Sequence, residues 1–139
     1  MPSSRKWKVL RIDEFDKSLK NLLKSYYRRN EKGKRKFQEL LMELLGQLQK
    51  TEFPLSPYWK GKPEPSPSGS IFPGQTLAKL YMKLPGLDGA AREGRIIYLI
   101  DRNRREIKLL YIYTHKDFVK RPSDKLIRKL LGRSGRNDS

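Results

Sequence analysis

The spacing of apolar residues changes part-way along the chain, and this change limits the folds that the chain can adopt. Between residues 15 and 48, apolar side chains recur at intervals of three and four, which is the period of an α-helix. Between residues 76 and 114 they alternate with polar residues or run continuously, as they do in β-strands. The two regions together predict an α+β fold in which helices pack on a sheet.

Two amphipathic helices are expected in the first region. Asp13 is placed to cap the first helix, and the acidic Glu14 and Asp16 suit its first turn. The segment 30–34, which contains Gly33, is expected to break the pattern, and the second helix should continue to about Lys50. The short connection favours an antiparallel helical hairpin. The two apolar stripes consist of Phe15, Leu19, Leu22, Leu23 and Tyr26, and of Phe37, Leu40, Leu41, Leu44, Leu45 and Leu48.

Four segments have the composition of strands. The first, Trp7–Ile12, precedes the helices, and the other three are Leu77–Leu84, Arg95–Asp101 and Glu106–Thr114. The last two are nearly continuous in Ile, Leu and Tyr, which is typical of central strands covered on both faces. The expected element order is therefore β-α-α-β-β-β-α, a helical hairpin packed on a mostly antiparallel sheet.

The segments outside these elements are expected to be irregular, except for one short helix. Six prolines and a Ser-rich run make residues 52–75 an extended surface loop, for which a structural or linker role is favoured over a binding role. After Pro122, Ser123 can cap a helix that carries four apolar residues up to Leu131. The basic tail 132–139 is expected to fray. Residues 1–139 are interpreted as a single domain.

Positive charge is concentrated at the two ends of the chain. The formal net charge is +17, and residues 1–35 and 102–139 each carry +8 of it. Such an excess of cations attracts polyanions, so nucleic acid or an acidic protein is the expected partner.

Several classes of site are excluded by residue content. The chain has no cysteine and only one histidine, His115, so disulfides, thiolate metal sites, a Cys nucleophile and His-pair zinc motifs are excluded, and no metal or cofactor is expected. The longest apolar runs have five residues, whereas a membrane span needs about twenty. With no signal-peptide pattern either, a cytoplasmic protein without membrane contact is expected.

The ordered series of segments resembles the RelE/ParE superfamily of type II toxins. The resemblance lies in IDEFDKSLKNLLKSY after a first strand, LAKLYMKLPG, GRIIYLID and IKLLYIYTHKDF. It covers roughly residues 7–51 and 76–131, and the Pro-rich stretch between them is longer than is usual in that family. The matching Arg-x-x-Tyr is Arg95 to Tyr98, and the matching strand end is Leu109–Tyr113.

The resemblance implies one of two activities. RelE-like members are endoribonucleases that cut mRNA without a metal, usually on the translating ribosome. ParE-like members share the fold, lack the nuclease residues and inhibit DNA gyrase. Both are neutralised by a cognate acidic antitoxin. We expect the RelE-like activity; the alternatives are a ParE-like inhibitor and a basic RNA-binding protein without catalysis.

Three strand cations are candidates for phosphate contact. Arg95 matches the strand arginine of the family, and its planar guanidinium can hold two phosphate oxygens. Its alternative role is a structural contact with Asp101, Asp117 or a backbone carbonyl. Lys79 and Lys83 lie four residues apart, about 13 Å along one face of a strand. They suit successive phosphates, or else form a solvated face of an edge strand.

The remaining candidates follow the third expected strand of that region. His115 is the residue type that exchanges protons near neutral pH, so we assign it an acid–base role; the family often has Lys there. Lys116 and Tyr113 are its substitutes, with Tyr113 stacking on a base or lying in the core. The other basic groups would follow the RNA backbone without reading sequence. They are Arg28, Arg29, Lys32, Arg102, Arg104 and Arg105.

Overall fold

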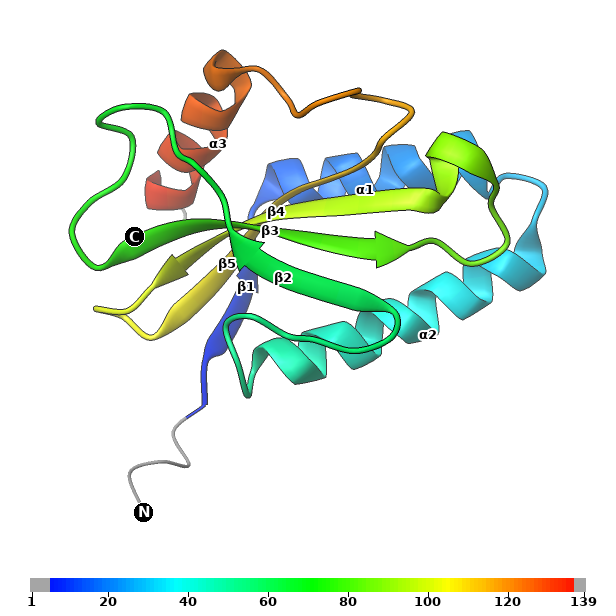
Figure 1. The fold of residues 1–139 in the computed structure, drawn as a ribbon, viewed down its shortest axis with the longest axis horizontal. Helices are drawn as coiled ribbons and strands as arrows, with labels where there is room; N and C mark the ends of the chain where they lie inside the picture. Colours follow the sequence, from blue (N-terminus) through cyan, green and yellow to red (C-terminus); the bar gives the residue numbers. More distant parts are fainter. Residues whose placement is uncertain (1–5, 137–139) are drawn as a thin grey trace.

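The computed structural model describes residues 6–136 and confirms the α+β class, with one strand more than the sequence predicts. The elements are β1 (Lys8–Arg11), α1 (Asp13–Tyr26), α2 (Glu31–Leu48), β2 (Trp59–Pro63), β3 (Gln75–Lys83), β4 (Glu93–Asp101), β5 (Glu106–Thr114) and α3 (Asp124–Arg136). A short 3₁₀ turn, η2 (Gly89–Arg92), precedes β4. In Figure 1, α1 and α2 extend along the sheet and are joined by the turn at the right of the view. α3 lies apart from them, at the upper left.

The five strands form one mixed sheet in the order β1-β5-β4-β3-β2. β1 pairs with β5 in parallel, and the other three pairings are antiparallel. β4 and β5 are interior strands, as their continuous apolar composition predicts, and their bounds end at Asp101 and Thr114 as expected. The register of β4 with β5 shifts between Ile97 and Tyr98, because β5 carries one extra residue at Leu110.

The helix starts differ from two expectations. The first helix is capped by Ile12 without a side-chain hydrogen bond, and Asp13 is its first helical residue. Gly33 does not break the pattern but lies in the first turn of α2, where its N–H donates to Oδ1 of Asn30 at 2.9 Å. A Cβ at Gly33 would lie 2.7 Å from Nδ2 of Asn30, so the glycine permits the cap. The break between the helices is therefore only residues 27–30.

The segment 52–75 is not a continuous loop, because β2 lies within it. Its sequence, WKGKP, carries two lysines, a glycine and a proline, so it has no strand pattern; an edge strand tolerates all of these. Gly61 is required there, since a Cβ would lie 2.6 Å from the hydroxyl of Tyr98, which donates to the carbonyl of Glu52. The hydroxyl of this buried tyrosine thereby ties the segment to the sheet.

The C-terminal helix is longer than expected. The cap at Ser123 is confirmed, since its Oγ accepts from the N–H of Leu126 at 3.2 Å. The helix continues through Gly132 to Arg136, so the expectation that the tail frays from residue 132 is wrong up to that point. Ser134 is buried, and its carbonyl accepts from Nζ of Lys108 at 3.0 Å, which holds the end of α3 on β5. The rest of the expected tail, 137–139, lies outside the described residues.

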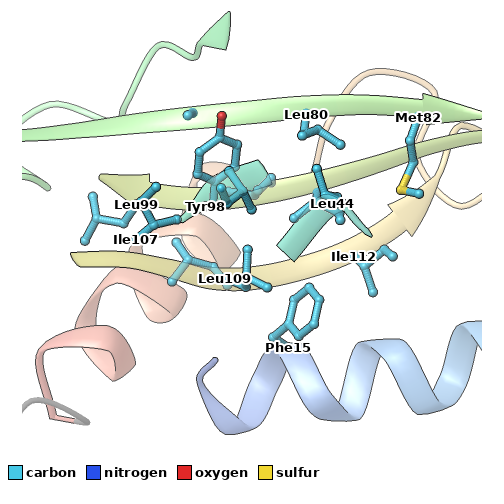
Figure 2. Close-up of a cluster of buried hydrophobic side chains, with 14 of the residues drawn as sticks. Phe15, Leu44, Leu80, Met82, Tyr98, Leu99, Ile107, Leu109 and Ile112 are labelled. Carbon is cyan, nitrogen blue, oxygen red and sulfur yellow. The ribbon is translucent and has the colours of Figure 1, made fainter. Parts of the chain in front are cut away.

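Buried side chains from α1, α2 and α3 and from β2 to β5 form one hydrophobic cluster, and Val9 of β1 packs against it partly buried. Figure 2 shows Leu44 of α2 against Leu80 and Met82 of β3, and Phe15 of α1 near Ile112 of β5. α1 also covers the part of β5 that extends beyond β1. There the hydroxyl of Ser18 accepts from the N–H of Ile112 at 3.0 Å, so this backbone group of the exposed edge is satisfied. None of the helices within residues 6–136 is both long and apolar enough to cross a bilayer.

Candidate nucleic-acid interface

One row of polar and aromatic side chains crosses the sheet on the face opposite α2. The strand register places Tyr81 of β3 opposite Arg95 of β4, and Arg95 opposite Tyr113 of β5. Residues in register on adjacent strands point to the same face, and their Cβ atoms lie about 4.5–5.5 Å apart. Arg95 and Tyr113, which the sequence predicts as separate candidates, are therefore neighbours on one face of the sheet.

Three cations surround the ring of Tyr81. The guanidinium carbon of Arg95 lies 4.3 Å from the ring centroid, and Nζ of Lys62 and Lys79 lie at 4.9 and 5.6 Å. Each distance is within the range of a cation–π interaction. Lys62 and Lys79 face each other across β2 and β3. The cations are therefore held by the sheet and by one aromatic ring. We call Tyr81, Arg95, Lys62 and Lys79 the cation cluster.

Arg95 makes part of the structural contact that was its alternative role. Its Nη1 donates to the carbonyl of Gly94 at 2.9 Å and lies 4.0 Å from Oε1 of Glu93. Its partners are thus a backbone carbonyl and Glu93, rather than Asp101 or Asp117. The side chain is 16% exposed, and a guanidinium has five N–H donors, so these contacts leave donors for a phosphate.

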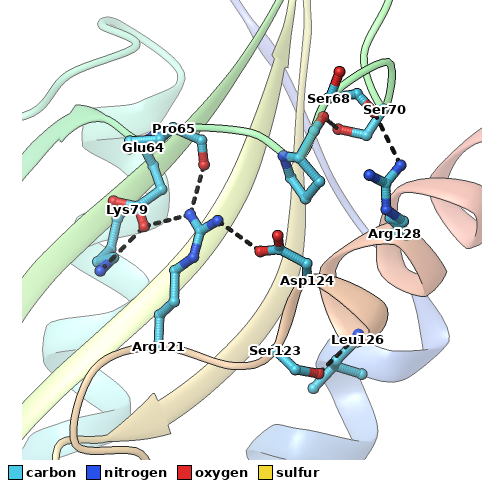
Figure 3. Close-up of polar contacts among 11 residues, drawn as sticks. Glu64, Pro65, Ser68, Ser70, Lys79, Arg121, Ser123, Asp124, Leu126 and Arg128 are labelled. Atoms are coloured by element: carbon cyan, nitrogen blue, oxygen red, sulfur yellow. Dashed lines mark hydrogen bonds and ion pairs between the residues drawn. The ribbon is translucent and has the colours of Figure 1, made fainter.

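Glu64 balances the charge of the cluster. Its Oε2 lies 3.3 Å from Nζ of Lys79 and 2.8 Å from Nη1 of Arg121, and Arg121 also pairs with Asp124 at 3.0 Å (Figure 3). The side chains of Glu64 and Lys79 are only 8% and 10% exposed. β3 is an interior strand, so the alternative of a solvated edge face is wrong for Lys79. Its ammonium is instead buried beside a carboxylate.

The hydroxyl of Tyr113 is buried and, among the described residues, has no hydrogen-bond partner. The ring packs edge-on against Phe118, with centroids 5.4 Å apart. Burial raises the pKa of the Tyr113 hydroxyl, the charge of Glu64 raises it further, and Arg95 opposes them. The hydroxyl is therefore protonated at neutral pH and able to donate. The ring of Tyr113 therefore packs in the core, and its hydroxyl lies close enough to Glu64 and Arg95 for their charges to shift its pKa.

A second row lies beside the first, toward the strand ends. Lys83 stands opposite Glu93, and Nζ of Lys83 lies 2.7 Å from both oxygens of Glu93. This hydrogen bond with Lys83 is the main cause that lowers the pKa of Glu93. The pairing continues to His115, whose backbone N–H donates to the carbonyl of Glu93 at 2.8 Å. By strand alternation His115 falls on the face of Tyr113, about 7 Å further along.

The basic groups assigned to the RNA backbone lie at both ends of the sheet. The turn that carries Arg28 and Arg29 adjoins Pro85 and Gly86, at the end near His115. The turn after β4 lies about 27 Å away, at the opposite end of that strand.

The sheet therefore does not bring the two sets of basic groups together. Arg28, Arg29 and Lys32 are exposed at the end of the sheet near His115. Arg102 pairs with Glu52 at 2.8 Å, Arg105 stacks on Trp7 at 4.3 Å, and the backbone N–H of Arg104 donates to Oδ1 of Asp101 at 3.2 Å. Lys116 is exposed in the turn after β5, and no contact within the described part of the chain joins its side chain to the cluster.

Four residues of this face were missed by sequence reasoning: Tyr81, Lys62, Glu64 and Arg121. Glu64 carried a signal, since it is the only acidic residue between Glu52 and Asp88 and stands between two prolines in a segment next to basic strands. Arg121 carried none, because it is one of many cations in the last third of the chain.

Comparison with protein-family models, with curated proteins and with solved structures gives no match.

Proposed function

We propose that this chain is a toxin of the RelE type, an endoribonuclease that cuts mRNA on the ribosome and is neutralised by an acidic antitoxin. The observation that carries the proposal is the row Tyr81–Arg95–Tyr113, with three cations around one ring and a buried hydroxyl free to donate. Fixed cations next to aromatic rings suit a polymer that alternates phosphates with planar bases.

The chemistry assigned to the row is transesterification within RNA. The 2′-oxygen bonds to phosphorus while the bond from phosphorus to the 5′-oxygen breaks, which leaves a 2′,3′-cyclic phosphate and a 5′-hydroxyl. Negative charge accumulates on the phosphoryl oxygens in the transition state. Arg95 stabilises that charge, and one such fixed donor contributes about 10²–10³ in rate. The protonated Tyr113 hydroxyl is buried in the free protein, and in the proposal it donates to the same oxygens after the side chains that cover it move on RNA binding.

His115 handles the proton in this proposal. It accepts the proton of the 2′-hydroxyl as the new bond forms, and the leaving 5′-oxygen takes a proton from water. Acid–base help of this kind contributes about 10²–10⁴ in rate. The position of His115 directly after β5, two residues beyond Tyr113, supports the assignment.

Glu64 acts in the proposal as an internal anion. Its carboxylate lies between Lys79 and Arg121, at the place that a phosphate oxygen of bound RNA would take. In the rival, a ParE-like inhibitor of DNA gyrase, the same ion pairs would serve stability alone. The net charge of +17 suits an acidic antitoxin in either case.

Induced expression tests the proposal against the rival. Arg95→Ala and His115→Ala should each relieve growth arrest and mRNA cleavage while antitoxin binding persists. Lys20→Ala removes one exposed cation from α1 and serves as the matched control, which should remain toxic. A double variant of Arg95 and His115 that arrests growth and cuts RNA like the wild type would refute the nuclease assignment.

A further inference from the structure

A shallow pocket lies beside the cation cluster, and one wall of the pocket is formed by part of the Pro-rich segment 52–75. Residues 54–61 form a small hairpin: Leu55 and Lys60 make an antiparallel bridge, and the N–H of Gly61 donates to the carbonyl of Pro54 at 2.9 Å. The hairpin adds to the edge of the sheet next to β3. The pocket between it and the sheet has a volume of about 260 Å³.

The pocket opens on the same face as the cation cluster. The bridge of Leu55 with Lys60, together with the register of Lys60 opposite Tyr81, continues the row Tyr81–Arg95–Tyr113 out to the hairpin. Tyr81 thus lines the pocket and also carries Arg95 on its ring. Adjacent strands are about 4.8 Å apart, so Arg95 lies one strand from the pocket wall.

The hairpin exposes apolar surface over this pocket. Leu55 is 77% exposed and Tyr58 is 56% exposed, and both line it. The tip is fixed by two hydrogen bonds of Ser56, whose N–H donates to the carbonyl of Trp59 and whose Oγ accepts from the N–H of Tyr58, each at 3.0 Å. Lys60, Lys83 and Glu93 also line the pocket, and because Lys83 pairs with Glu93, the net positive charge of the lining comes from Lys60. The backbone that carries the exposed Tyr58 ring is therefore fixed before any ligand binds.

The geometry points to this pocket as a subsite for one nucleobase of single-stranded RNA, adjacent to the phosphate at Arg95. The inference rests on the proposed function. A nucleotide presents a planar base next to a phosphate, and the pocket presents an exposed ring and a leucine next to a cation cluster. Base stacking on an aromatic side chain tolerates all four bases, so the subsite adds affinity more than sequence preference.

Fluorescence binding with an uncleavable probe tests the subsite. The probe is a short 2′-O-methyl oligonucleotide carrying one 2-aminopurine, whose emission is quenched on stacking, and a second oligonucleotide lacks that base. Tyr58→Ala should weaken binding of the intact probe about 5- to 100-fold and abolish the quenching. Binding of the abasic probe should not change. Leu55→Ala should act in the same direction.

Phe72→Ala is the matched control, because Phe72 is an aromatic residue 74% exposed that does not line the pocket. Equal effects of Tyr58→Ala and Phe72→Ala, or equal wild-type affinity for intact and abasic probes, would overturn the subsite and leave the phosphate site standing. Loss of binding of both probes in Arg95→Ala is the separate sign that Arg95 contacts phosphate. Failure of wild-type protein to bind either probe would overturn the subsite and the phosphate site together, whereas the mapping of RNA ends tests the nuclease itself.

Discussion

Glu64→Gln tests whether the carboxylate beside the cation cluster stabilises the fold and also occupies a site for a bound anion. The change keeps the size of the side chain and removes its charge. In the folded protein it leaves Lys79 without the carboxylate 3.3 Å away, while Arg121 keeps Asp124 at 3.0 Å. The cost should therefore fall mainly on Lys79, whose side chain is 10% exposed.

The expected loss of stability is moderate. Removing one partner of a fully buried ion pair costs about 3–5 kcal/mol, and partial exposure of the cations here reduces that to about 2–3 kcal/mol. For a chain of this size, 1 kcal/mol corresponds to about 3–5 °C in melting temperature. Glu64→Gln should thus melt about 6–15 °C below the wild type.

The same substitution should create an anion site. With the internal carboxylate gone, sulfate at about 100 mM can approach Lys79, and an anion that binds only the folded state raises its stability. Thermal denaturation followed by circular dichroism, with and without sulfate, measures both effects. Sulfate should raise the melting temperature of Glu64→Gln more than that of the wild type, and RNA should bind the variant more tightly.

Glu39→Gln is the matched control, since Glu39 is exposed on α2 and far from the cluster along the chain. If Glu64→Gln melts within about 1 °C of this control, the ion pairs do not stabilise the fold as argued. If sulfate raises the melting temperatures of variant and wild type equally, Glu64 does not occupy an anion site.

Three further substitutions test other parts of the structure. Tyr113→Phe removes a buried hydroxyl without a described partner, so chemical denaturation should show unchanged or about 1 kcal/mol higher stability while RNA cleavage falls about tenfold or more. Ser18→Ala leaves the N–H of Ile112 unpaired and should lower the free energy of unfolding by about 1–3 kcal/mol. Lys83 lowers the pKa of Glu93 in the folded protein. Their pairing therefore stabilises the fold at pH values above 4.5, the pKa of Glu93 in the unfolded chain, and this stabilisation is lost as the pH falls below that value. Lys83→Met should therefore be less stable than the wild type at pH 7, by at most about 1 kcal/mol because the pair is partly exposed, and equal to it near pH 3 in denaturant titrations.

Periodicity was a good guide to the elements with strong apolar patterns. The two helices and the interior strands β4 and β5 were predicted because each buries a stripe or a whole strand, and burial constrains sequence. The edge strand β2 was missed because an edge buries little, so WKGKP has no pattern to read. Gly33 was misinterpreted because a small residue at a helix cap has the same local sequence as a break.

The candidate site could be predicted only residue by residue. Arg95, Lys79 and Tyr113 were selected from chemistry and resemblance, but their common face depends on the register between strands, which the sequence does not state. Glu64 and Arg121 were missed because they come from connecting segments whose path is set by tertiary contacts. The turn that carries Arg28 and Arg29 and the turn after β4 stay apart for the same reason, since the length of β4 separates them, although β1 and β5 pair and so join the two basic ends of the chain elsewhere.

The most direct test of the proposed nuclease is the analysis of RNA ends after incubation of purified protein with mRNA, alone and on programmed ribosomes. The wild type should produce 5′-hydroxyl and 2′,3′-cyclic phosphate ends, and Arg95→Ala should produce about 10²–10³ times fewer of them at equal stability. RNA left whole under both conditions, by a protein that inhibits supercoiling by DNA gyrase, would contradict the nuclease and support the ParE-like rival.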